Sequence, residues 1–543
     1  MKGQEVEGSE LDMKTFNTTG RCIPEKHYMV DIHNKLVKIK QMVQQGSYFV
    51  INRARQYGKT TTLRMLPNVL SPEYAVISLD FQKVSSAQFA DEEVFSCSFA
   101  ELMLKTIKNK NNPVEGLSEQ QVKLLENAVN EQKIKNLGQL FYYISDLCAA
   151  SEKPIVLVID EVDSAANNQV FLDFLTQLRA YYLDRDITST FYSVILAGVY
   201  DIKNLKLKIR PETEHGYNSP WNIAVEFRVD MSFNRNEIQT MLNEYEVDWK
   251  TGMDTETMAD LLYDYTAGYP YLVSKICQIL DEQVVELEQY QSRTAVWTKE
   301  GFLEAVKRLL KESNTLFDDI LKKLQEYAEL KNMLWNILFQ GENYPFNPYE
   351  FSTNLGLMFG FVKERENQVV VANRIFETLL YNLFLAESSN KYEIYGEATK
   401  ELSQFVSGGV LQMDVVMRKF MEHFTEIYAD ASDKFIEENG RRIFLIYLRP
   451  IINGTGNYYI EAQTRDRKRT DIIVDYKGVQ EIIELKIWHG EEYQKRGEKQ
   501  LFEYLDFYHK EKGYLLSFNF NKKKKADMHE IEYGGKRIVE VVV

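Results

Sequence analysis

The chain has 543 residues, of which 44% are apolar, 13% aromatic and 27% charged. This composition is that of a folded globular protein, which excludes extensive disorder, and the length predicts two to four domains rather than one hydrophobic core. The net charge of −15 argues against a uniformly basic protein that coats nucleic acid.

The negative charge is unevenly distributed along the chain. Residues 1–400 hold 42 basic and 56 acidic side chains, whereas residues 401–543 hold 23 and 24. The last quarter is therefore nearly neutral and contains basic clusters, among them Lys522–Lys525, which is most simply a solvated loop between two strands. A nucleic-acid partner stays possible for this quarter, because phosphate binding depends on local positive charge.

The sequence carries no targeting signal. Residues 1–20 are polar and acidic rather than basic and then apolar, so they do not resemble a secretory signal. No apolar run approaches the length of a membrane span. The four cysteines lack the spacing of a disulfide framework or a metal site, which is typical of a reducing compartment. We therefore expect a cytoplasmic protein without a membrane partner.

Four short apolar runs in the first 200 residues are rich in β-branched side chains and are separated by longer amphipathic stretches. This alternation predicts a parallel sheet covered by helices on both faces. The runs are 48–52, 75–80, 154–160 and 192–197.

After the predicted sheet the pattern becomes helical. Residues from about 235 to 310 predict a helical lid, and two further helical stretches precede apolar runs at 358–362 and 369–371, which together indicate a winged-helix module. The polar stretch 387–399 is the best candidate for a linker. We expect four domains, namely a P-loop domain at 1–234, the lid at 235–312, the winged helix at 313–390 and a C-terminal domain at 391–543.

A candidate phosphate-binding loop follows the first predicted strand. Arg53 to Tyr57 lead into Gly58-Lys59-Thr60-Thr61 and then into a helix-like stretch. Phosphates need inward-pointing backbone N–H groups at a helix N-terminus, a Lys for the terminal phosphates and a hydroxyl for Mg²⁺. Gly58, Lys59, Thr60 and Thr61 are therefore the expected ATP-binding residues, although Arg53 stands where such loops usually have glycine.

The strand at 155–159 ends in the two carboxylates Asp160 and Glu161. At the carboxyl end of a parallel strand, the first would support Mg²⁺ and the second would polarise the attacking water. The alternative is a solvated acidic turn that Asp163 continues. No residue near Ala197-Gly198-Val199 marks a γ-phosphate sensor. Arg210 and Arg228 are candidate charge-stabilising arginines, but the favoured interpretation of each is a surface or ion-pair residue.

Three of these features resemble the AAA-ATPase-like family of bacteria and some eukaryotes over roughly residues 14–310. They are the Arg-rich loop ending in Gly-Lys-Thr, the Asp160-Glu161 strand end, and Thr266-Ala-Gly-Tyr-Pro-Tyr271. The resemblance implies that Arg53 is normal for this loop. It also implies that Gly268-Tyr-Pro270 corresponds to the lid segment that approaches the nucleotide in STAND-type and archaeal switch ATPases.

A second set of candidate functional residues lies in the C-terminal domain. Asp471 follows Thr470 in one predicted strand, and Glu484 and Lys486 lie in the next, beyond a turn at Lys477-Gly478. Alternate residues on a strand share a face, so Glu484 and Lys486 lie together, and Asp471 joins them if the strands pair antiparallel. Two carboxylates can hold Mg²⁺ against a phosphodiester while a Lys acts on the water. The alternative is a cross-strand ion pair.

Flanking residues extend this pattern. Glu438 opens an apolar-faced helix before the strands, Gln500 lies in a helix expected to begin near Lys499, and basic residues at 465–469 precede Asp471. The order of helix Glu, strand Asp, strand Glu-x-Lys and helix Gln resembles the PD-(D/E)XK nuclease superfamily over about residues 400–543. The resemblance implies Glu438, Asp471 and Glu484 as metal ligands, with Glu437 able to replace Glu438, and Glu484, Lys486 and Gln500 as catalytic residues.

The predicted fold is α/β, in which a P-loop parallel sheet with a helical lid and a winged helix precedes a small α/β restriction-endonuclease-like domain. The leading hypothesis is an ATPase, with Glu161 as its catalytic carboxylate, that controls a nuclease dependent on Mg²⁺ or Mn²⁺. Its expected partner is DNA, with RNA not excluded, and a homo-oligomer is possible. The alternative is a non-cleaving ATPase switch whose nuclease-like domain only binds nucleic acid or a protein. A metabolic kinase would need an acceptor site that the sequence does not show.

Overall fold

The structure is a computed structural model. It describes residues 13–165, 168–199, 221–290, 292–339, 342–388, 393–428, 437–452, 456–463, 469–477, 479–488, 491–519 and 525–543. Within these ranges, the side chains of residues 437–438, 457, 459–463, 469–471, 491–494 and 507 lie outside the description. No helix in the described ranges is long and apolar enough to cross a membrane.

The chain divides into two compact units. The first contains the described residues of Met1–Tyr245 with the short segments Tyr269–Ser274 and Met358–Gly360, and the second contains Glu246–Gly268, Lys275–Leu357 and Phe361–Val543. The elements predicted as lid, winged helix and C-terminal domain therefore lie mostly within one compact unit. The three domain boundaries at 234, 312 and 390 stay predictions.

The first unit is built on a four-stranded parallel sheet with strand order β1-β4-β3-β2. The strands fall on the four predicted apolar runs, which confirms the parallel sheet. They are β1 (Tyr48–Asn52), β2 (Ala75–Asp80), β3 (Ile155–Asp160) and β4 (Ser193–Gly198).

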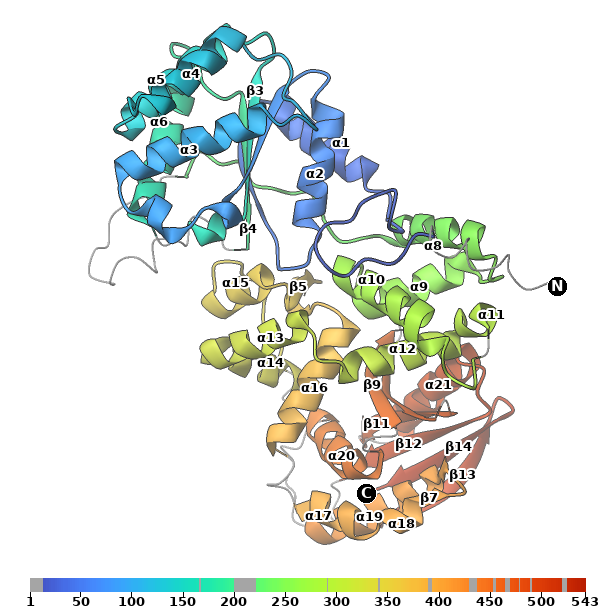
Figure 1. The fold of residues 1–543 in the computed structure, drawn as a ribbon. Coiled ribbons are helices and arrows are strands. Elements are labelled where there is room, and N and C mark those ends of the chain that lie inside the picture. Colours follow the sequence, from blue (N-terminus) through green and yellow to red (C-terminus); the bar gives the residue numbers. More distant parts are fainter. Residues whose placement is uncertain are drawn as a thin grey trace, which may run out of the picture. The chain divides into compact units, whose positions relative to one another are not determined.

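Helices cover both faces of this sheet, as seen in the blue and teal part of Figure 1. One group packs its aromatic and aliphatic side chains on Ile77, Leu157 and Leu196 to form a hydrophobic core. Strands buried on both faces are apolar throughout, which explains the continuous apolar runs. This group is α3 (Glu92–Ile107), α4 (Glu119–Asn130), α5 (Leu137–Ala150) and α6 (Gln169–Leu183), and α1 (His33–Gln44) and α2 (Lys59–Leu70) lie on the other side.

The middle of the chain is helical, as predicted. The hairpin in this region is β5 (Val362–Arg365) paired antiparallel with β6 (Gln368–Val371). The sequence predicted a strand at 358–362, but only Val362 of this run belongs to one. The winged-helix module stays a prediction. The helices are α8 (Arg235–Trp249), α9 (Thr255–Thr266), α10 (Pro270–Ile279), α11 (Arg293–Val296), α12 (Lys299–Lys311), α13 (Thr315–Glu326), α14 (Ala328–Phe339), α15 (Phe351–Met358) and α16 (Arg374–Ser388).

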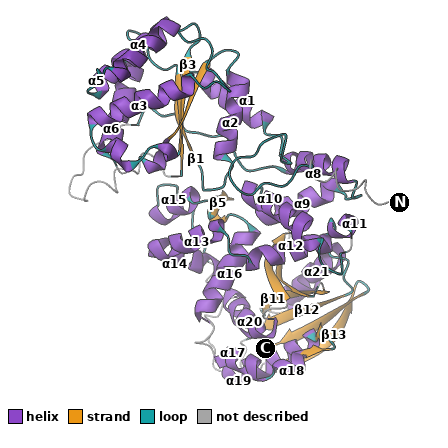
Figure 2. Ribbon diagram, viewed as in Figure 1, coloured by secondary structure: helices purple, strands orange, loops and turns teal. Residues whose placement is uncertain are grey.

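The C-terminal part contains a six-stranded mixed sheet with order β13-β14-β12-β11-β10-β9, drawn in orange in Figure 2. The strands β9, β10 and β11 form an antiparallel meander, and β11, β12 and β14 run parallel. The strands are β9 (Gly456–Gln463), β10 (Arg469–Tyr476), β11 (Val479–Ile487), β12 (Lys512–Phe518), β13 (Asp527–Tyr533) and β14 (Lys536–Val542).

Helices pack on the two faces of this second sheet. Leu501 and Leu505 of α21 (Glu491–Phe507) pack with Leu515 and Ile482 on one face. The opposite face holds Phe518, which contacts α19 (Met413–Ile427) and α20 (Glu437–Ile452). The order of α20, β10, β11 and α21 agrees with the predicted order of a helix, a strand with Asp471, a strand with Glu484 and Lys486, and a helix with Gln500.

Two predicted boundaries in this part were inaccurate. α21 begins at Glu491, so Gln500 lies in its middle rather than at its start. The proposed linker at 387–399 is also shorter than expected. α16 continues to Ser388 and α17 (Glu393–Lys400) occupies most of the remainder.

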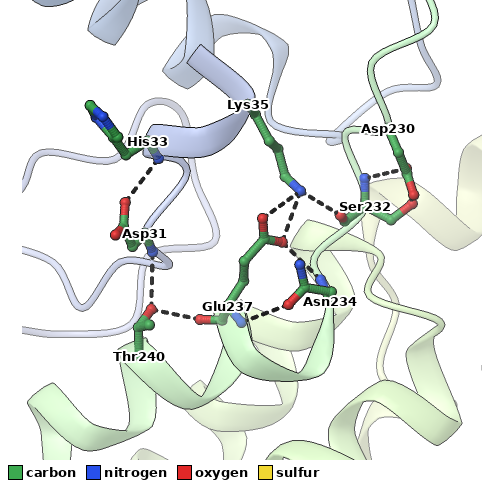
Figure 3. A network of polar contacts seen from close by, with 8 residues as sticks. All are labelled: Asp31, His33, Lys35, Asp230, Ser232, Asn234, Glu237 and Thr240. Atoms are coloured by element: carbon green, nitrogen blue, oxygen red, sulfur yellow. Dashed lines mark hydrogen bonds and ion pairs between the residues drawn. The ribbon is translucent and has the colours of Figure 1, made fainter. Parts of the chain in front are cut away.

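A buried ion pair ties the N-terminal helix α1 to α8 within the first unit (Figure 3). The Nζ atom of Lys35 donates to both carboxylate oxygens of Glu237 at 2.8 Å and to the carbonyl oxygen of Ser232 at 3.0 Å. Glu237 also accepts from the N–H of Asn234, whose side chain in turn accepts from the N–H of Glu237. This reciprocal capping begins α8 and fixes the position of Ser232.

We predict that Lys35→Met destabilises the first unit by about 3 kcal/mol or more, because it leaves the Glu237 charge buried without its cation. Thermal unfolding should show this as a fall in midpoint of about 6 °C or more. The matched control is Lys40→Met, since Lys40 pairs with a Glu73 side chain that is 50% exposed and should lose about 1 kcal/mol or less. Equal shifts for the two variants would contradict the role assigned to the buried pair.

Candidate functional site: a phosphate-binding loop and a buried carboxylate–lysine pair

The loop between β1 and α2 has the backbone geometry that phosphate binding requires. Gly58 is in the left-handed region with φ 77°, and α2 begins at the next residue, Lys59. Glycine adopts this conformation without the steric penalty that other residues incur. The turn therefore delivers the N-terminus of α2, with its unpaired N–H groups, directly to the loop.

The side chain of Lys59 lies across the loop at which the phosphates would bind. Its Nζ atom donates to the carbonyl oxygens of Arg53 at 2.8 Å and Ala54 at 2.9 Å. Burial lowers the pKa of this amine, and the neighbouring carboxylates of Glu161, Asp163 and Asp160 oppose that effect. The ammonium is thus held beside the loop by neutral carbonyls, which phosphate oxygens can replace.

Thr60 and Asp160 meet as the sequence predicts. The Thr60 hydroxyl donates to Oδ2 of Asp160 at 3.0 Å, which places a hydroxyl and a carboxylate side by side at the carboxyl end of β3. Such a pair of hard oxygen donors fits Mg²⁺. Thr61 is engaged differently, since its hydroxyl accepts from the N–H of Cys22 in the N-terminal segment.

Glu161 follows Asp160 in an unusual conformation. Its φ of 57° turns the backbone sharply at the end of β3, and its N–H donates to Oδ1 of Asp160 at 2.9 Å. Burial raises the pKa of Glu161, and the adjacent Asp160 raises it further. Burial also raises the pKa of Asp160. A glutamate with a raised pKa beside the phosphate loop is suited to accept a proton from water.

Asp163 is a site residue that the sequence assigned only to a solvated turn. Its Oδ2 atom accepts from the N–H of Val199 at 2.5 Å, just beyond the end of β4. A Cβ atom on Gly198 would lie 2.8 Å from Oδ1 of Asp163, so this approach depends on glycine. Gly198 and Val199 at the end of β4 offer no polar side chain, and Asp163 supplies the polar group there. This lack of a polar side chain at the strand end was the sequence signal.

The structure does not support a charge-stabilising role for either candidate, Arg228 or Arg210. The side chain of Arg228 is 83% exposed and pairs with Glu226 at 2.8 Å, which agrees with a surface ion pair. Arg210 lies outside the described residues.

Arg53, which replaces the usual glycine, holds the loop by its side chain. One terminal nitrogen donates to the carbonyl oxygens of Val229 at 3.0 Å and Phe227 at 3.4 Å, and the other donates to the Asn52 carbonyl at 2.9 Å. The guanidinium also lies over the Phe227 ring, with Cζ 5.1 Å from its centroid. Arg53 therefore fixes the start of the loop to the segment before α8.

Two tyrosines support the other side of the loop. The Tyr57 hydroxyl lies 3.0 Å from Oγ of Ser232, the residue whose carbonyl binds Lys35. The Tyr269 hydroxyl donates to the Arg55 carbonyl at 2.6 Å, and its ring meets that of Tyr57 edge to face at 4.6 Å. The Gly-Tyr-Pro segment thus contacts the loop, as its resemblance to the lid segment implied.

In the C-terminal sheet, Glu484 and Lys486 lie together on β11 as predicted. The Glu484 side chain is fully buried, and Nζ of Lys486 lies 2.9 Å from its Oε1 atom. The antiparallel register pairs Ile472 with Ile483, so the next pair of this register sets the backbone of Asp471 opposite Glu484. The side chain of Asp471 lies outside the description.

Two residues of α21 lie at this pair. A Cβ atom on Gly497 would be 3.2 Å from Cγ of Lys486, so the glycine makes room for the lysine. A glycine in a helix interior destabilises the helix by about 0.5–1 kcal/mol. The presence of Gly497 in this helix was therefore the sequence signal for the contact with Lys486. Gln500, one turn later, donates from Nε2 to the Tyr504 hydroxyl at 2.8 Å.

The helical carboxylate is only partly located. Glu437 and Glu438 are the first residues of α20, as the sequence predicts, but their side chains lie outside the description. Among the described side chains, no group of three or more His, Cys, Asp or Glu residues could hold a metal ion. Because Asp471 and Glu438 are not among them, the predicted metal ligands stay predictions.

Comparison with known proteins identifies the family. A family model described as an AAA-like domain matches residues 25–382, which is more than half of the chain. The chain therefore belongs to the AAA-like domain family, and its N-terminal part is a P-loop ATPase-like domain. A search of curated proteins found no match.

The chain is also similar to several solved structures at low identity. The Walker-type ATPase of Pyrococcus abyssi is 14% identical with a TM-score of 0.43, and the match covers 67% of this chain and 99% of that one. The Aeropyrum pernix ORC2 protein, in ADPNP–ADP complexes, is 12% identical with a TM-score of 0.34, covering 66% and 93%. The Aeropyrum pernix ORC1 protein in complex with DNA is 12% identical with a TM-score of 0.28, covering 66% and 94%.

We predict that Arg53→Gly, which introduces the usual glycine, weakens ATP binding about tenfold or more. The change removes charge-assisted hydrogen bonds to Phe227 and Val229, each about 1.5–3 kcal/mol, and frees the loop backbone. Titration with a fluorescent ATP analogue measures the affinity, and Arg64→Ala on the exposed side of α2 is the control. Tighter binding by Arg53→Gly would contradict the supporting role.

Proposed function

We propose that this protein binds and hydrolyses ATP at the loop of residues 53–61. We further propose that it cleaves phosphodiester bonds in DNA at the C-terminal sheet, with the nucleotide state regulating access to that site. The observation that carries the second part is the fully buried Glu484 paired with Lys486, opposite Asp471 in the strand register. The first part rests on the family and on the Thr60–Asp160 contact.

For ATP hydrolysis, each residue has a distinct role. Lys59 exchanges the carbonyl oxygens of Arg53 and Ala54 for oxygens of the terminal phosphates. Thr60 and Asp160 would hold Mg²⁺, which neutralises phosphate charge when bound. Glu161 orients the attacking water and accepts its proton, a role that its raised pKa favours.

The ATPase assignment is tested by two variants. Lys59→Ala should lower the affinity for a fluorescent ATP analogue about 100-fold, because it removes the ammonium group that bonds the carbonyl oxygens of Arg53 and Ala54 in the loop. Glu161→Gln should bind the analogue normally and hydrolyse ATP about 100-fold more slowly, since it loses the general base. An unchanged affinity in Lys59→Ala would remove the loop assignment, and Lys40→Ala serves as control.

For cleavage, the sheet offers two carboxylates and one cation. Asp471 and Glu484, with Glu438 from α20, would hold Mg²⁺ or Mn²⁺, which polarises the scissile phosphate when bound. Lys486 would position the attacking water, and Gln500 would contact water or phosphate. The set fits such a metal because carboxylate oxygens are hard ligands.

A buried ion pair without a metal is the competing explanation. Lys486 at 2.9 Å can neutralise Glu484 by itself, which favours a non-cleaving switch whose sheet binds nucleic acid or a protein. In that case Asp471 contributes little. The two explanations differ in whether the carboxylates bind a divalent cation.

The nuclease assignment is tested by metal titration beside DNA cleavage. Asp471→Asn and Glu484→Gln should each lower Mn²⁺ affinity and cleavage together, whereas Lys486→Ala should keep Mn²⁺ binding and lose cleavage about 100-fold. Glu481→Gln is the matched control, because it lies on the same strand with its side chain on the opposite face. A wild-type protein that neither binds Mn²⁺ calorimetrically nor cleaves linear, circular or single-stranded DNA would favour the switch.

A further inference from the structure

Strand β4 separates the two halves of the candidate ATP site. In the sheet order β1-β4-β3-β2, the phosphate loop follows β1, and the carboxylates Asp160 and Glu161 stand at the end of β3, so the end of β4 lies between them. The strands of this sheet run parallel, which brings their carboxyl ends to one edge. The contacts that hold the end of β4 therefore set the spacing between the phosphate loop and the carboxylates.

Asp163 binds the end of β4 on the side of β3. Its Oδ2 atom accepts from the Val199 N–H at 2.5 Å. A Cβ atom on Gly198 would lie 2.8 Å from Oδ1 of Asp163 and 3.0 Å from Cγ2 of Val162, so a side chain there would displace the carboxylate. Because a hydrogen bond to a carboxylate is stronger than one between neutral groups, this contact fixes the turn after β3 to the end of β4.

The phosphate loop binds the same strand end on the side of β1. The Gly198 carbonyl oxygen accepts from the Arg53 N–H at 3.2 Å. The Arg53 carbonyl oxygen in turn accepts from Nζ of Lys59 at 2.8 Å. A path of hydrogen bonds and covalent backbone thus runs from Asp163 through Gly198 and Arg53 to Lys59, and all of these residues lie in the first unit.

Asp163 also belongs to the turn that follows Glu161. This turn is the short helix Val162–Ser164, in which the Ser164 hydroxyl lies 2.9 Å from the Glu161 carbonyl oxygen and 3.1 Å from that of Phe81. Glu161 has a left-handed backbone with φ 57°, which a residue other than glycine keeps only where its surroundings hold it. The contact between Asp163 and Val199 is one of the restraints on this turn.

We propose that Asp163 is a positioning residue for ATP hydrolysis, which fixes the turn of Glu161 to the end of β4 and thereby sets the position of Glu161 relative to the phosphate loop. This role rests on the proposed ATP hydrolysis. The loop has a separate restraint, because the Arg53 side chain binds the carbonyls of Val229 and Phe227. Loss of the Asp163 contact should therefore slow the hydrolysis step and leave ATP binding largely intact.

The competing explanation is a purely electrostatic role. Burial lowers the pKa of Lys59, and the charge of Asp163 is among those that oppose this shift. Two substitutions separate the explanations. Asp163→Asn removes the charge and keeps an oxygen that accepts from the Val199 N–H, whereas Gly198→Ala keeps the charge and displaces the carboxylate.

The proposal is tested by steady-state ATP hydrolysis of the full chain, with the affinity for a fluorescent ATP analogue measured in parallel. Asp163→Ala and Gly198→Ala should each lower kcat about 30-fold, which is the scale of a slightly misplaced catalytic group, while KM and the affinity change less than about threefold. Asp163→Asn should recover kcat to within about fivefold of the wild-type value. The matched control is Asp173→Ala, which removes an exposed carboxylate of α6.

Three results would overturn the proposal. The first is a wild-type kcat in Asp163→Ala, and the second is an affinity that falls as far as kcat, which indicates a role in loop structure alone. The third is a loss in Asp163→Asn equal to that in Asp163→Ala beside an active Gly198→Ala, which indicates the electrostatic role. A wild type that binds the analogue without hydrolysing ATP overturns the proposed hydrolysis and this role together, whereas equal hydrolysis by the wild type and Asp163→Ala rejects this role alone. Gly198→Ala leaves Asp163 in the chain, so a folding defect in one variant does not prevent the other from deciding.

Discussion

The main structural constraint in the N-terminal unit is that the backbone of the loop at residues 53–61 stays accessible to a phosphate. This chain achieves that with side chains rather than with glycine at the first loop position. Arg53 binds the carbonyls of Val229 and Phe227, Tyr57 contacts Ser232, and the Lys35–Glu237 pair holds Ser232 in place. The loop is consequently linked to α1 and α8 by polar contacts. Because each contact is directional, the loop has little freedom to collapse when no phosphate is present.

The C-terminal sheet has a different electrostatic constraint, because it buries the carboxylate of Glu484 completely. An isolated charge at Glu484 would be strongly unfavourable, and the neighbouring ammonium of Lys486 compensates it. Gly497 leaves space for that lysine beneath α21. The pairing and the helix position are therefore interdependent.

The sequence predicted those parts of the structure that follow local rules. The four apolar runs predicted the parallel sheet, and Gly58-Lys59-Thr60 predicted the loop. The alternation of side chains along β11 predicted that Glu484 lies beside Lys486. What it missed depends on contacts between distant segments. Asp163 reaches the end of β4 only because the turn after β3 returns toward Gly198, and the stack of Arg374 on Tyr265 joins residues more than 100 positions apart. Periodicity carries no information about such contacts.

The open edge of the C-terminal sheet has a consequence for how copies of the chain meet. β13 is the last strand in the order, so one row of its backbone N–H and C=O groups has no neighbouring strand among the residues that the structure describes. Asp527, Glu530 and Glu532 are exposed or partly exposed along it. A second copy approaching this edge would align carboxylates with carboxylates, and their repulsion opposes edge-to-edge pairing at neutral pH. The exposed carboxylates of β13 thus act against the edge-to-edge association of two copies.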